Sequence, residues 1–433
     1  MSDDVLRDLQ YLHNLRSQGL SDEEIARVLL DLTLQAAPPE LADAIRVCAI
    51  PAWFDAGHLA LLAEKDEEQA AALLERIATF SFVLPRDAGG YVYHEATRAR
   101  LLDWWREPDH GPRFAALNER LARRYLALAR EQRPRLSGPD YLDALTVMDA
   151  AYPNLRAAWE GAVEAENHEL LRSFAYALHN YFQRRGLWTE WITWTEIALE
   201  ASKRADDIES IAGLQNNLGN AYQSLPTGDR AANLEQAIAC YREALRIYTP
   251  EAAPLDYAMT QNNLGTAYAD LPTGDRAANL EQAIECYSAA LQAEYLSSHD
   301  QAMYHRNRAD ALIRLNRLDE AEQDIEQARA LAPDHPYTHA RLGQLAFARE
   351  DYPAAVEHYT AAIDRQPEAG FYFDRGLAHL ALGHQDQALA DYQAAIPLAD
   401  SITIAEALKE LNEFAADHPD TPGLDAIRAL LET

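Results

Sequence analysis

The sequence LPTGDRAANLEQAI occupies Leu225–Ile238 and recurs at Leu271–Ile284, an offset of 46 residues. Each copy follows a nearly identical phrase, NNLGNAY at Asn216–Tyr222 and NNLGTAY at Asn262–Tyr268. A fixed offset between two copies predicts one structural unit stacked on itself. We therefore expect the surrounding chain to form an array of repeats.

The residues around these copies are spaced like two helices that pack closely. Leu-Gly precedes a tyrosine on a first helix, and an Ala-aromatic-Ala stripe follows on a second. In the two copies these residues are Leu218-Gly219 with Tyr222, Ala237, Tyr241 and Ala244, then Leu264-Gly265 with Tyr268, Ala283, Tyr287 and Ala290. Small residues seven apart with a ring between them form one helical stripe that a neighbouring helix can approach. This spacing resembles the tetratricopeptide repeat, which implies an α-solenoid.

Degenerate copies follow the identical ones. Their second-helix stripes are Ala321, Ile325, Ala328, then Ala355, Tyr359, Ala362, then Ala388, Tyr392, Ala395. The step from the first stripe to the second matches the usual period of this repeat, which is about 34 residues. The array thus reaches five repeats, and residues 187–199 predict the second helix of a sixth, divergent one.

The two identical copies exceed the usual period because residues are inserted between their helices, around Pro226–Asp229 and Pro272–Asp275. Pro-Thr-Gly-Asp is typical of a loop, so the insertions should lengthen loops on one face. Extended repeats of this kind resemble the arrays found beside caspase-like CHAT proteases and signalling ATPases in bacteria.

The region before the repeats has a different pattern. Residues 3–17 and 21–34 predict two helices, the second with a capping box formed by Ser21 and Glu24. Residues 41–106 predict three helices, a hairpin turning at 87–90, and a closing helix. This order resembles the winged-helix domain of NB-ARC and related signal-transducing ATPases. Residues 151–188 resemble the helical region that follows that domain in bacterial members.

In that family the wing ends in a Met-His-Asp motif whose histidine touches the nucleotide phosphate. The matching residues here are Tyr93, His94 and Glu95, so two of the three positions differ. A phosphate loop needs Gly-Lys-Ser/Thr, and none of the chain's three lysines follows a glycine. We expect no ATPase in this chain. His94 then either ends a strand structurally or contacts an ATPase on another chain.

Other catalytic patterns are not found. The sequence contains no HExxH, CxxC or GxSxG motif. His335 and His339 have a spacing that suits a metal but lack an evident third ligand. Cys240 and Cys286 occupy equivalent repeat positions and are predicted to be small buried thiols. We expect a non-enzymatic protein with no cofactor and no metal.

Charge restricts the class of partner. A net charge of −31 repels nucleic acid and anionic membranes, so we expect neither as a partner. GLSDEEIARVL resembles the start of a helix-turn-helix unit, although no recognition helix follows. A third hypothesis is a transcription regulator, which would require the winged helix to bind DNA. The acidic start MSDDVLRDLQ is unlike a secretory signal, so we expect a cytoplasmic protein. The partner should be a protein rather than a small-molecule substrate.

These patterns predict a mainly α fold with one β-hairpin, in which a small winged-helix domain leads into a solenoid. The expected parts are a helical segment at 1–38, the winged-helix-like domain at 39–108, a helical spacer with a divergent repeat at 109–205, the repeat array at 206–400 and capping helices at 401–433. Trp188, Trp191 and Trp194 are expected either to pack the first repeat against the spacer or to form an exposed platform.

In this repeat class the first helices line the inner surface of the solenoid, and a bound segment would lie along it. The polar and aromatic residues predicted to point inward are Asn216, Asn220, Gln223, Asn262, Asp270, Arg306, Asp310, Arg314, Gln344 and Phe347. Amides can read a peptide backbone, arginines can pair with a carboxylate, and Phe347 can anchor an apolar side chain. The predicted function is an adaptor for a partner protein segment. The alternative is a regulatory or sensor subunit of a bacterial signalling or defence system, working with a protease or ATPase on another chain.

Overall fold

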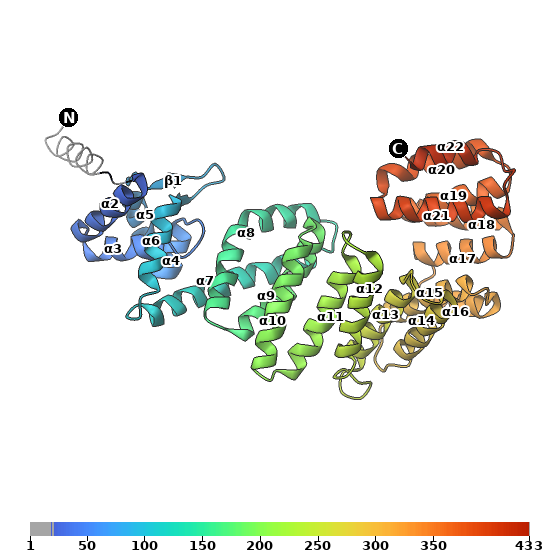
Figure 1. The fold of residues 1–433 in the computed structure, drawn as a ribbon, viewed down its shortest axis with the longest axis horizontal. Helices are drawn as coiled ribbons and strands as arrows, with labels where there is room; N and C mark the ends of the chain where they lie inside the picture. The colour runs from blue at the N-terminus through green and yellow to red at the C-terminus, as the bar shows by residue number, and fades with distance from the viewer. Residues whose placement is uncertain (1–18, 20, 433) are drawn as a thin grey trace. The chain divides into compact units, whose positions relative to one another are not determined.

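The computed structural model describes residue 19 and residues 21–432, so the helix predicted at 3–17 lies outside the described residues. The chain is mainly α-helical with one short hairpin, which confirms the predicted fold class (Figure 1). It divides into two compact units, one ending at Ser210 and one beginning at Ile211. Each unit has its own buried core, and each is described separately below. The finer division into five parts stays a prediction.

The first unit begins with the predicted capping box. The Ser21 hydroxyl accepts the Glu24 backbone N–H at 3.3 Å, and the Glu24 carboxylate accepts the Ser21 N–H at 2.7 Å. Two of the unpaired amides at the start of helix α2 (Asp22–Ala36) are thereby satisfied. The next helices are α3 (Pro39–Val47), α4 (Ala56–Ala63) and α5 (Glu67–Ile77).

The predicted hairpin follows these helices. Strands β1 (Val83–Pro85) and β2 (Tyr91–Tyr93) pair antiparallel, with Val83 opposite Tyr93. Gly89 and Gly90 turn the chain between them with φ angles of 87° and 75°. Glycine adopts this region without strain. The Tyr93 hydroxyl donates to the Ile45 carbonyl at 2.9 Å, which ties the hairpin to α3. Helix α6 (Glu95–Trp105) closes this part.

Four longer helices complete the first unit: α7 (Gly111–Arg135), α8 (Tyr141–Glu164), α9 (His168–Arg185) and α10 (Trp188–Arg204). The Trp194 ring of α10 stacks on the Trp159 ring of α8 with centroids 4.3 Å apart. Trp191 is 2% exposed and Trp194 is 6% exposed. The tryptophans therefore pack between helices, as one of the two predictions had it, and do not form an exposed platform.

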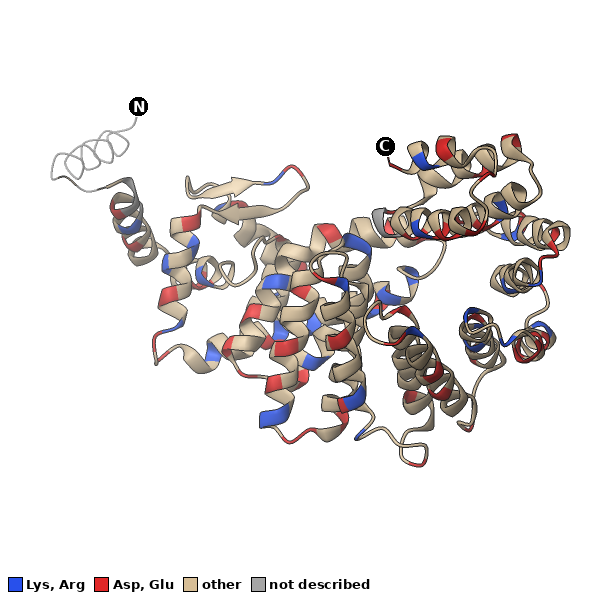
Figure 2. Ribbon diagram, turned by 45° about the vertical axis from the view of Figure 1, so that its right-hand side comes forward, with Lys and Arg blue, Asp and Glu red and all other residues tan. Residues whose placement is uncertain are grey.

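The second unit is a succession of helix pairs that follow one another along an arc (Figure 2). The pairs are α11 (Ile208–Ser224) with α12 (Arg230–Ala244), α13 (Pro254–Asp270) with α14 (Arg276–Leu291), α15 (Ser298–Arg314) with α16 (Leu318–Leu331), α17 (Pro336–Ala348) with α18 (Tyr352–Arg365), and α19 (Ala369–Ala381) with α20 (Gln385–Ala395). These are the five predicted repeats.

One contact holds each of four pairs together. In the first pair, a Cβ added to Gly219 would lie 2.5 Å from Cε1 of the Tyr241 ring, closer than real Cβ contacts occur. The Tyr241 side chain is fully buried. The glycine is therefore required because the ring occupies the space that any larger residue would need. Equivalent contacts join Gly265 to Tyr287, Gly343 to Tyr359 and Gly376 to Tyr392.

The identical insertions fold into identical loops. Gly228 turns the first loop with φ of 84°, and the Asp229 carboxylate then accepts the N–H groups of Ala231 and Ala232 at the start of α12. The Asn233 side-chain amide donates back to the Thr227 carbonyl at 2.8 Å. Gly274, Asp275 and Asn279 make the same turn, cap and return bond in the second copy. These loop and cap contacts give a physical reason for the residues that both copies share.

Two further helices follow the last repeat. A short 3-10 turn, η1 (Ile396–Leu398), leads into α21 (Ser401–Asp417) and α22 (Leu424–Leu431). Leu411 of α21 and Ile427 of α22 are fully buried against α19 and α20. The apolar face of the last repeat is thereby covered, as a solenoid requires at its end.

Candidate functional site

The first helices of the repeats form one wall of the second unit. Helix α13 packs on α15, α15 on α17 and α17 on α19, in addition to the contacts within each pair. We call the accessible side chains of α11, α13, α15, α17 and α19 the inner face. A binding site for an extended segment would lie along this face, because it is continuous from repeat to repeat.

Asparagine side chains connect the first three of these helices. Asn263 of α13 donates to the Asn216 side chain at 3.3 Å and to the Asn220 side chain at 3.1 Å, both on α11. Asn307 of α15 donates to the Asn262 side chain of α13 at 2.9 Å. Side-chain amides therefore link one repeat to the next, because amides both donate and accept.

The ten predicted residues divide by burial. Asn216 is 6% exposed, Asn262 is 7% exposed and Arg306 is 5% exposed, so these three are part of the packing between helices. The other seven keep more accessible surface: Asn220, Gln223, Asp270, Asp310, Arg314, Gln344 and Phe347. The structure thus places a subset of the predicted residues on the inner face.

Two of the accessible amides are fixed by the buried tyrosine of their own repeat. The Tyr241 hydroxyl lies 2.7 Å from the side-chain oxygens of both Asn220 and Gln223. Burial raises the pKa of Tyr241 well above its ordinary value, so the hydroxyl keeps its proton and donates. Since the hydroxyl has a single proton, it donates to one of these amides and can accept an N–H from the other.

A charged cluster occupies the middle of the inner face. The Asp310 carboxylate lies 3.3 Å from Arg314 on its own helix and 3.0 Å from Arg341 of α17. Arg341 also donates to the Gln344 side chain at 2.5 Å. Arg314 is therefore already paired, and a helix rise of about 1.5 Å per residue sets it about 12 Å along α15 from Arg306. The two arginines that the sequence suggested as a pair occupy separate positions.

Phe347 is partly covered by the end of the array. Its ring lies 5.2 Å from the Tyr352 ring and 6.5 Å from the Phe414 ring of α21, centroid to centroid. Phe347 packs at the edge of the C-terminal core, which leaves it less free to anchor a ligand than the sequence suggested.

Three carboxylates that the sequence analysis did not single out, Asp374, Glu406 and Glu410, interact electrostatically with the predicted residues Asp270 and Asp310. Desolvation by the surrounding protein atoms raises the pKa of Asp270 to about 6 although 41% of its side chain is exposed, and the charges of Asp310 and of Glu406 on α21 add to the rise. Burial raises the pKa of Glu410 to about 7, helped by Glu406 and again by Asp310. Burial and the charge of Glu410 raise the pKa of Asp374 on α19. Carboxylates on α13, α15, α19 and α21 therefore interact electrostatically with one another.

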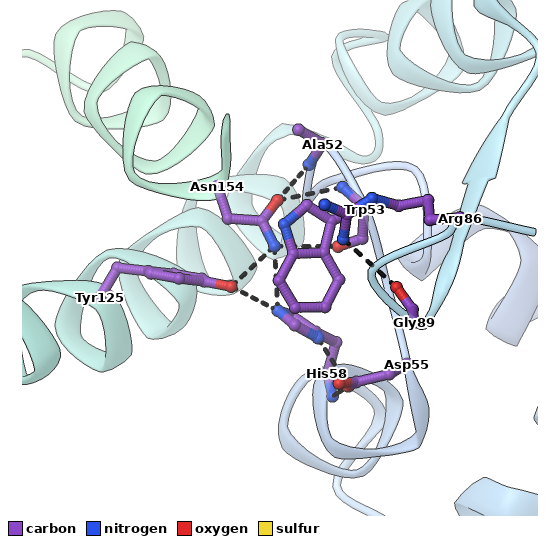
Figure 3. A network of polar contacts seen from close by, with 8 residues as sticks. All are labelled: Ala52, Trp53, Asp55, His58, Arg86, Gly89, Tyr125 and Asn154. Atoms are coloured by element: carbon purple, nitrogen blue, oxygen red, sulfur yellow. Dashed lines mark hydrogen bonds and ion pairs between the residues drawn. The ribbon is translucent and has the colours of Figure 1, made fainter. Parts of the chain in front are cut away.

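A second polar network lies in the first unit (Figure 3). The Asn154 side-chain oxygen accepts the N–H groups of Ala52 and Trp53, and its amide donates to the Trp53 carbonyl and the Tyr125 hydroxyl, all between 2.6 and 3.0 Å. The Tyr125 hydroxyl and the His58 Nε2 atom are 2.7 Å apart.

His58 completes this network through its other ring nitrogen. The Nδ1 atom lies 2.7 Å from the Asp55 carboxylate, whose pKa falls to about 2 chiefly because of that hydrogen bond. Asn154 is fully buried and His58 is 1% exposed. An Asp-His-Tyr chain can relay a proton, but neither imidazole nor hydroxyl is open to a substrate here. The network instead fastens the segment before α4 to α7 and α8.

The remaining candidate residues do not form a reactive site. His94 begins α6 at the end of β2, is exposed and makes no side-chain cap bond. The three cysteines are buried as free thiols, as predicted for Cys240 and Cys286. His335 accepts the Tyr337 backbone N–H, which gives it a role as a helix cap. Among the described residues no cluster of three or more His, Cys, Asp or Glu side chains is arranged to hold a metal ion.

Within the described part of the chain, none of the helices combines the length and the apolar character that spanning a bilayer requires.

Comparison with known proteins finds a family match for two segments of the array. Residues 302–335 and 340–401 match tetratricopeptide repeats. A segment of 100 residues is 34% identical to the Hsp70-Hsp90 organizing protein of Triticum aestivum, covering 23% of this chain and 17% of that protein. A DnaJ homolog subfamily C member 7 homolog from Dictyostelium discoideum is 29% identical over 117 residues, covering 27% of this chain and 22% of that protein. The chain therefore spans about a fifth of the length of these relatives.

Among solved structures, a tetratricopeptide repeat protein from Parabacteroides merdae ATCC 43184 aligns with 61% of this chain and 99% of its own, at 16% identity and a TM-score of 0.41. The packing of glycine against tyrosine seen in the matched repeat at Gly343 and Tyr359 also occurs at Gly219 and Gly265. Residues 302–335 and 340–401 are tetratricopeptide repeats, and the helix pairs before them share the same internal packing.

Proposed function

We propose that this protein is a non-enzymatic scaffold whose repeat array binds an extended segment of a partner protein along the inner face. One observation carries the proposal. Accessible polar side chains of successive first helices contact one another: the Asp310 carboxylate of α15 lies 3.0 Å from Arg341 of α17, and Asn263 of α13 donates to Asn220 of α11 at 3.1 Å. A surface shared by several repeats can contact many residues of one extended ligand.

The side chains on this face suit a polypeptide. Asn220 and Gln223 are partly accessible amides, a group that can donate to and accept from a peptide backbone. Gln344 lies beside the charged pair of Asp310 and Arg341. The acidic residues favour a segment that carries basic side chains near α13 and α21. The relatives named as organizing proteins for Hsp70 and Hsp90 support a role in holding other proteins.

The proposal is tested by adding bulk and charge to the inner face. Asn220→Arg with Gln344→Arg should abolish capture of a partner from native lysate. Circular dichroism should show that the double variant is still folded, although it loses the hydrogen bonds of Asn220 to Tyr241 and Asn263. The matched control is Gln236→Arg with Gln282→Arg, which adds the same charge to exposed positions on the second helices α12 and α14. If both double variants captured the partner equally well, the inner face would not be the binding site.

A second function is favoured by one residue. His94 is exposed at the junction of β2 and α6, where NB-ARC-like proteins contact a nucleotide, so the chain could serve as a regulatory subunit for an ATPase carried on another chain. The isolated chain should then give no heat of binding with ATP or ADP in magnesium, and His94→Ala should weaken only a complex with such an ATPase. Micromolar nucleotide binding by the chain alone would contradict both proposals.

A further inference from the structure

A recess in the first unit is lined by three arginines. It lies between α7 and α9, which pack on each other, and its volume is about 320 Å³. The residues that line it are Arg130 and Arg133 of α7, with Arg172, Ser173, Tyr176 and Ala177 of α9. All of them belong to the first unit, so the recess is distinct from the inner face of the repeat array.

Hydrogen bonds hold two of the three guanidinium groups in place. The Arg130 Nη2 atom donates to the Ser173 hydroxyl at 3.2 Å, which joins the two walls of the recess. The Arg172 Nη1 atom donates to the Ser210 hydroxyl at 2.8 Å. Arg130 and Arg133 are three residues apart on α7, so their side chains share one face of that helix. The three charges are therefore gathered at one place.

Two of these charges have no counterion. Among the described residues, no carboxylate pairs with Arg130 or Arg133. The third arginine, Arg172, has a partial counterion, because the Asp207 carboxylate lies 3.7 Å from its Nη1 atom. Three other arginines of α7 do pair with carboxylates: Arg113 with Asp43, Arg120 with Glu64 and Arg123 with Glu119. The same helix thus pairs arginines elsewhere and leaves two uncompensated at the recess.

The net charge of the chain conceals this local excess of positive charge. The whole chain carries −31, but salt screens charges that lie more than about 8 Å apart in solvent at physiological ionic strength. A small anion inside the recess would therefore interact mainly with the lining arginines. A long polyanion such as nucleic acid would also extend over acidic surface, which repels it.

We propose that this recess binds the phosphoryl group of a small phosphate monoester. A guanidinium presents its N–H donors in a planar fork that matches phosphate oxygens. A phosphoryl group carries nearly two negative charges, which matches the two uncompensated arginines, whereas a single carboxylate would neutralise only one. The volume of about 320 Å³ is at the lower end of pockets that hold small molecules. The inference does not rest on the proposed function, because this ligand would bind in addition to a partner segment.

The test is isothermal titration calorimetry of the full chain with inorganic phosphate and with glycerol 3-phosphate, at an ionic strength of about 0.15 M. These probes carry no metal, unlike magnesium nucleotides, in which the metal occupies phosphate oxygens. The wild type should bind glycerol 3-phosphate with a Kd of about 1 mM or below. Acetate should bind about tenfold more weakly or worse, because it brings a single charge.

Two variants separate the recess from the rest of the surface. Arg130→Gln with Arg133→Gln should weaken the binding of glycerol 3-phosphate by about tenfold or more, and should still fold because both side chains are exposed. Ser173→Glu places a carboxylate in the recess beside Arg130 and should weaken binding as much. The matched control, Arg76→Gln with Arg156→Gln, removes two charges from exposed positions outside the recess and should bind like the wild type.

Four results would overturn the inference. The first is no binding of either probe by the wild type, and the second is unchanged binding in the Arg130 and Arg133 variant. The third is equal affinity for acetate, because the recess would then recognise negative charge alone. The fourth is a phosphoserine peptide that binds more than about tenfold more tightly than glycerol 3-phosphate, which would make the ligand a protein. None of these results alters the outcome of the Asn220 and Gln344 test of the inner face.

Discussion

The Tyr241 ring occupies the space that a side chain on Gly219 would need: a Cβ there would meet the ring at 2.5 Å. The same relationship recurs in three later repeats, so one steric fact sets the distance between the two helices of each pair. The glycine is needed for close approach rather than for an unusual backbone angle, because it lies in the middle of a helix.

The close approach makes Gly265 sensitive to a single added methyl group. In Gly265→Ala that group would meet the buried Tyr287 ring at 2.8 Å, so the two helices would have to separate. We expect a loss of about 1–3 kcal/mol of stability, measured by chemical unfolding of the full chain. Gly370→Ala is the control, since a Cβ there meets nothing within 4 Å. It should be neutral or stabilising by about 0.4–1 kcal/mol, and equal effects of the two substitutions would contradict the steric explanation.

The Asn154 network predicts a large effect in the first unit. Asn154→Ala leaves the buried N–H groups of Ala52 and Trp53 and the Tyr125 hydroxyl with fewer partners. Asn154→Ala should therefore lower the free energy of unfolding by about 2–4 kcal/mol. The control Asn180→Ala removes a single exposed hydrogen bond to Ser137. Its effect on stability should stay below about 0.5 kcal/mol. Differential scanning calorimetry compares the two variants. A similar small loss of stability in both would show that the Asn154 network does not stabilise the packing of the segment before α4 against α7 and α8.

The inner-face carboxylates predict how stability changes with pH. A carboxyl pKa raised by folding means that the folded chain disfavours the charged form. Its contribution to stability is therefore greatest below the ordinary pKa of about 4 and is lost as pH rises through about 6 for Asp270 and about 7 for Glu410. Asp270→Asn with Glu410→Gln should be more stable than the wild type at about pH 8, and the difference should vanish below about pH 4.

Both side chains are reached by solvent. Screening therefore reduces the expected gain at about pH 8 to the order of 1 kcal/mol. Histidines contribute equally to the pH dependence of both proteins, because both contain them. Their contribution therefore disappears from the difference in stability between the variant and the wild type. Glu251→Gln with Glu294→Gln changes the charge equally at exposed positions and should show no such pH dependence. A wild-type-like pH profile in the inner-face variant would mean that these carboxylates do not share a space.

The array should fold without the first unit. Its contacts run mainly between neighbouring helices, and the last repeat is capped by α21 and α22. A fragment of residues 206–433 should therefore unfold cooperatively and show strong helical circular dichroism. A disordered fragment would mean that α9 and α10 supply an essential cap at the other end.

Local features were predictable because neighbouring residues determine them. The Ser21 capping box, the turn at Gly89 and Gly90, and the packing of Ala237 and Tyr241 follow from spacing and from the special conformations of glycine. The loops at Pro226–Asp229 were recognised for the same reason. In each case the interacting residues lie within about one helix pair of each other in the sequence.

The inner face was predicted only in part, because it depends on how helices rotate and how the solenoid curves. A step of one residue turns a helical side chain by about 100°. This rotation is why Asn262 is buried while the neighbouring Asn263 reaches back to α11. Glu406 comes from α21, far along the chain, and its charge nevertheless acts on Asp270, which no local sequence pattern indicates. Arg306 is buried where α15 packs against α17. No local sequence pattern predicts how these two helices pack.

Site-specific photo-cross-linking tests the central claim most directly. A photoreactive amino acid is placed in the full chain at Asn220 or Gln344 on the inner face, or at Gln236 or Gln282 on the second helices, and irradiated in cells of the source organism. A scaffold that holds a partner segment along its inner face should yield the same cross-linked polypeptide from both inner positions and none from the outer pair. Cross-links from Gln236 and Gln282 without any from Asn220 and Gln344 would contradict the account.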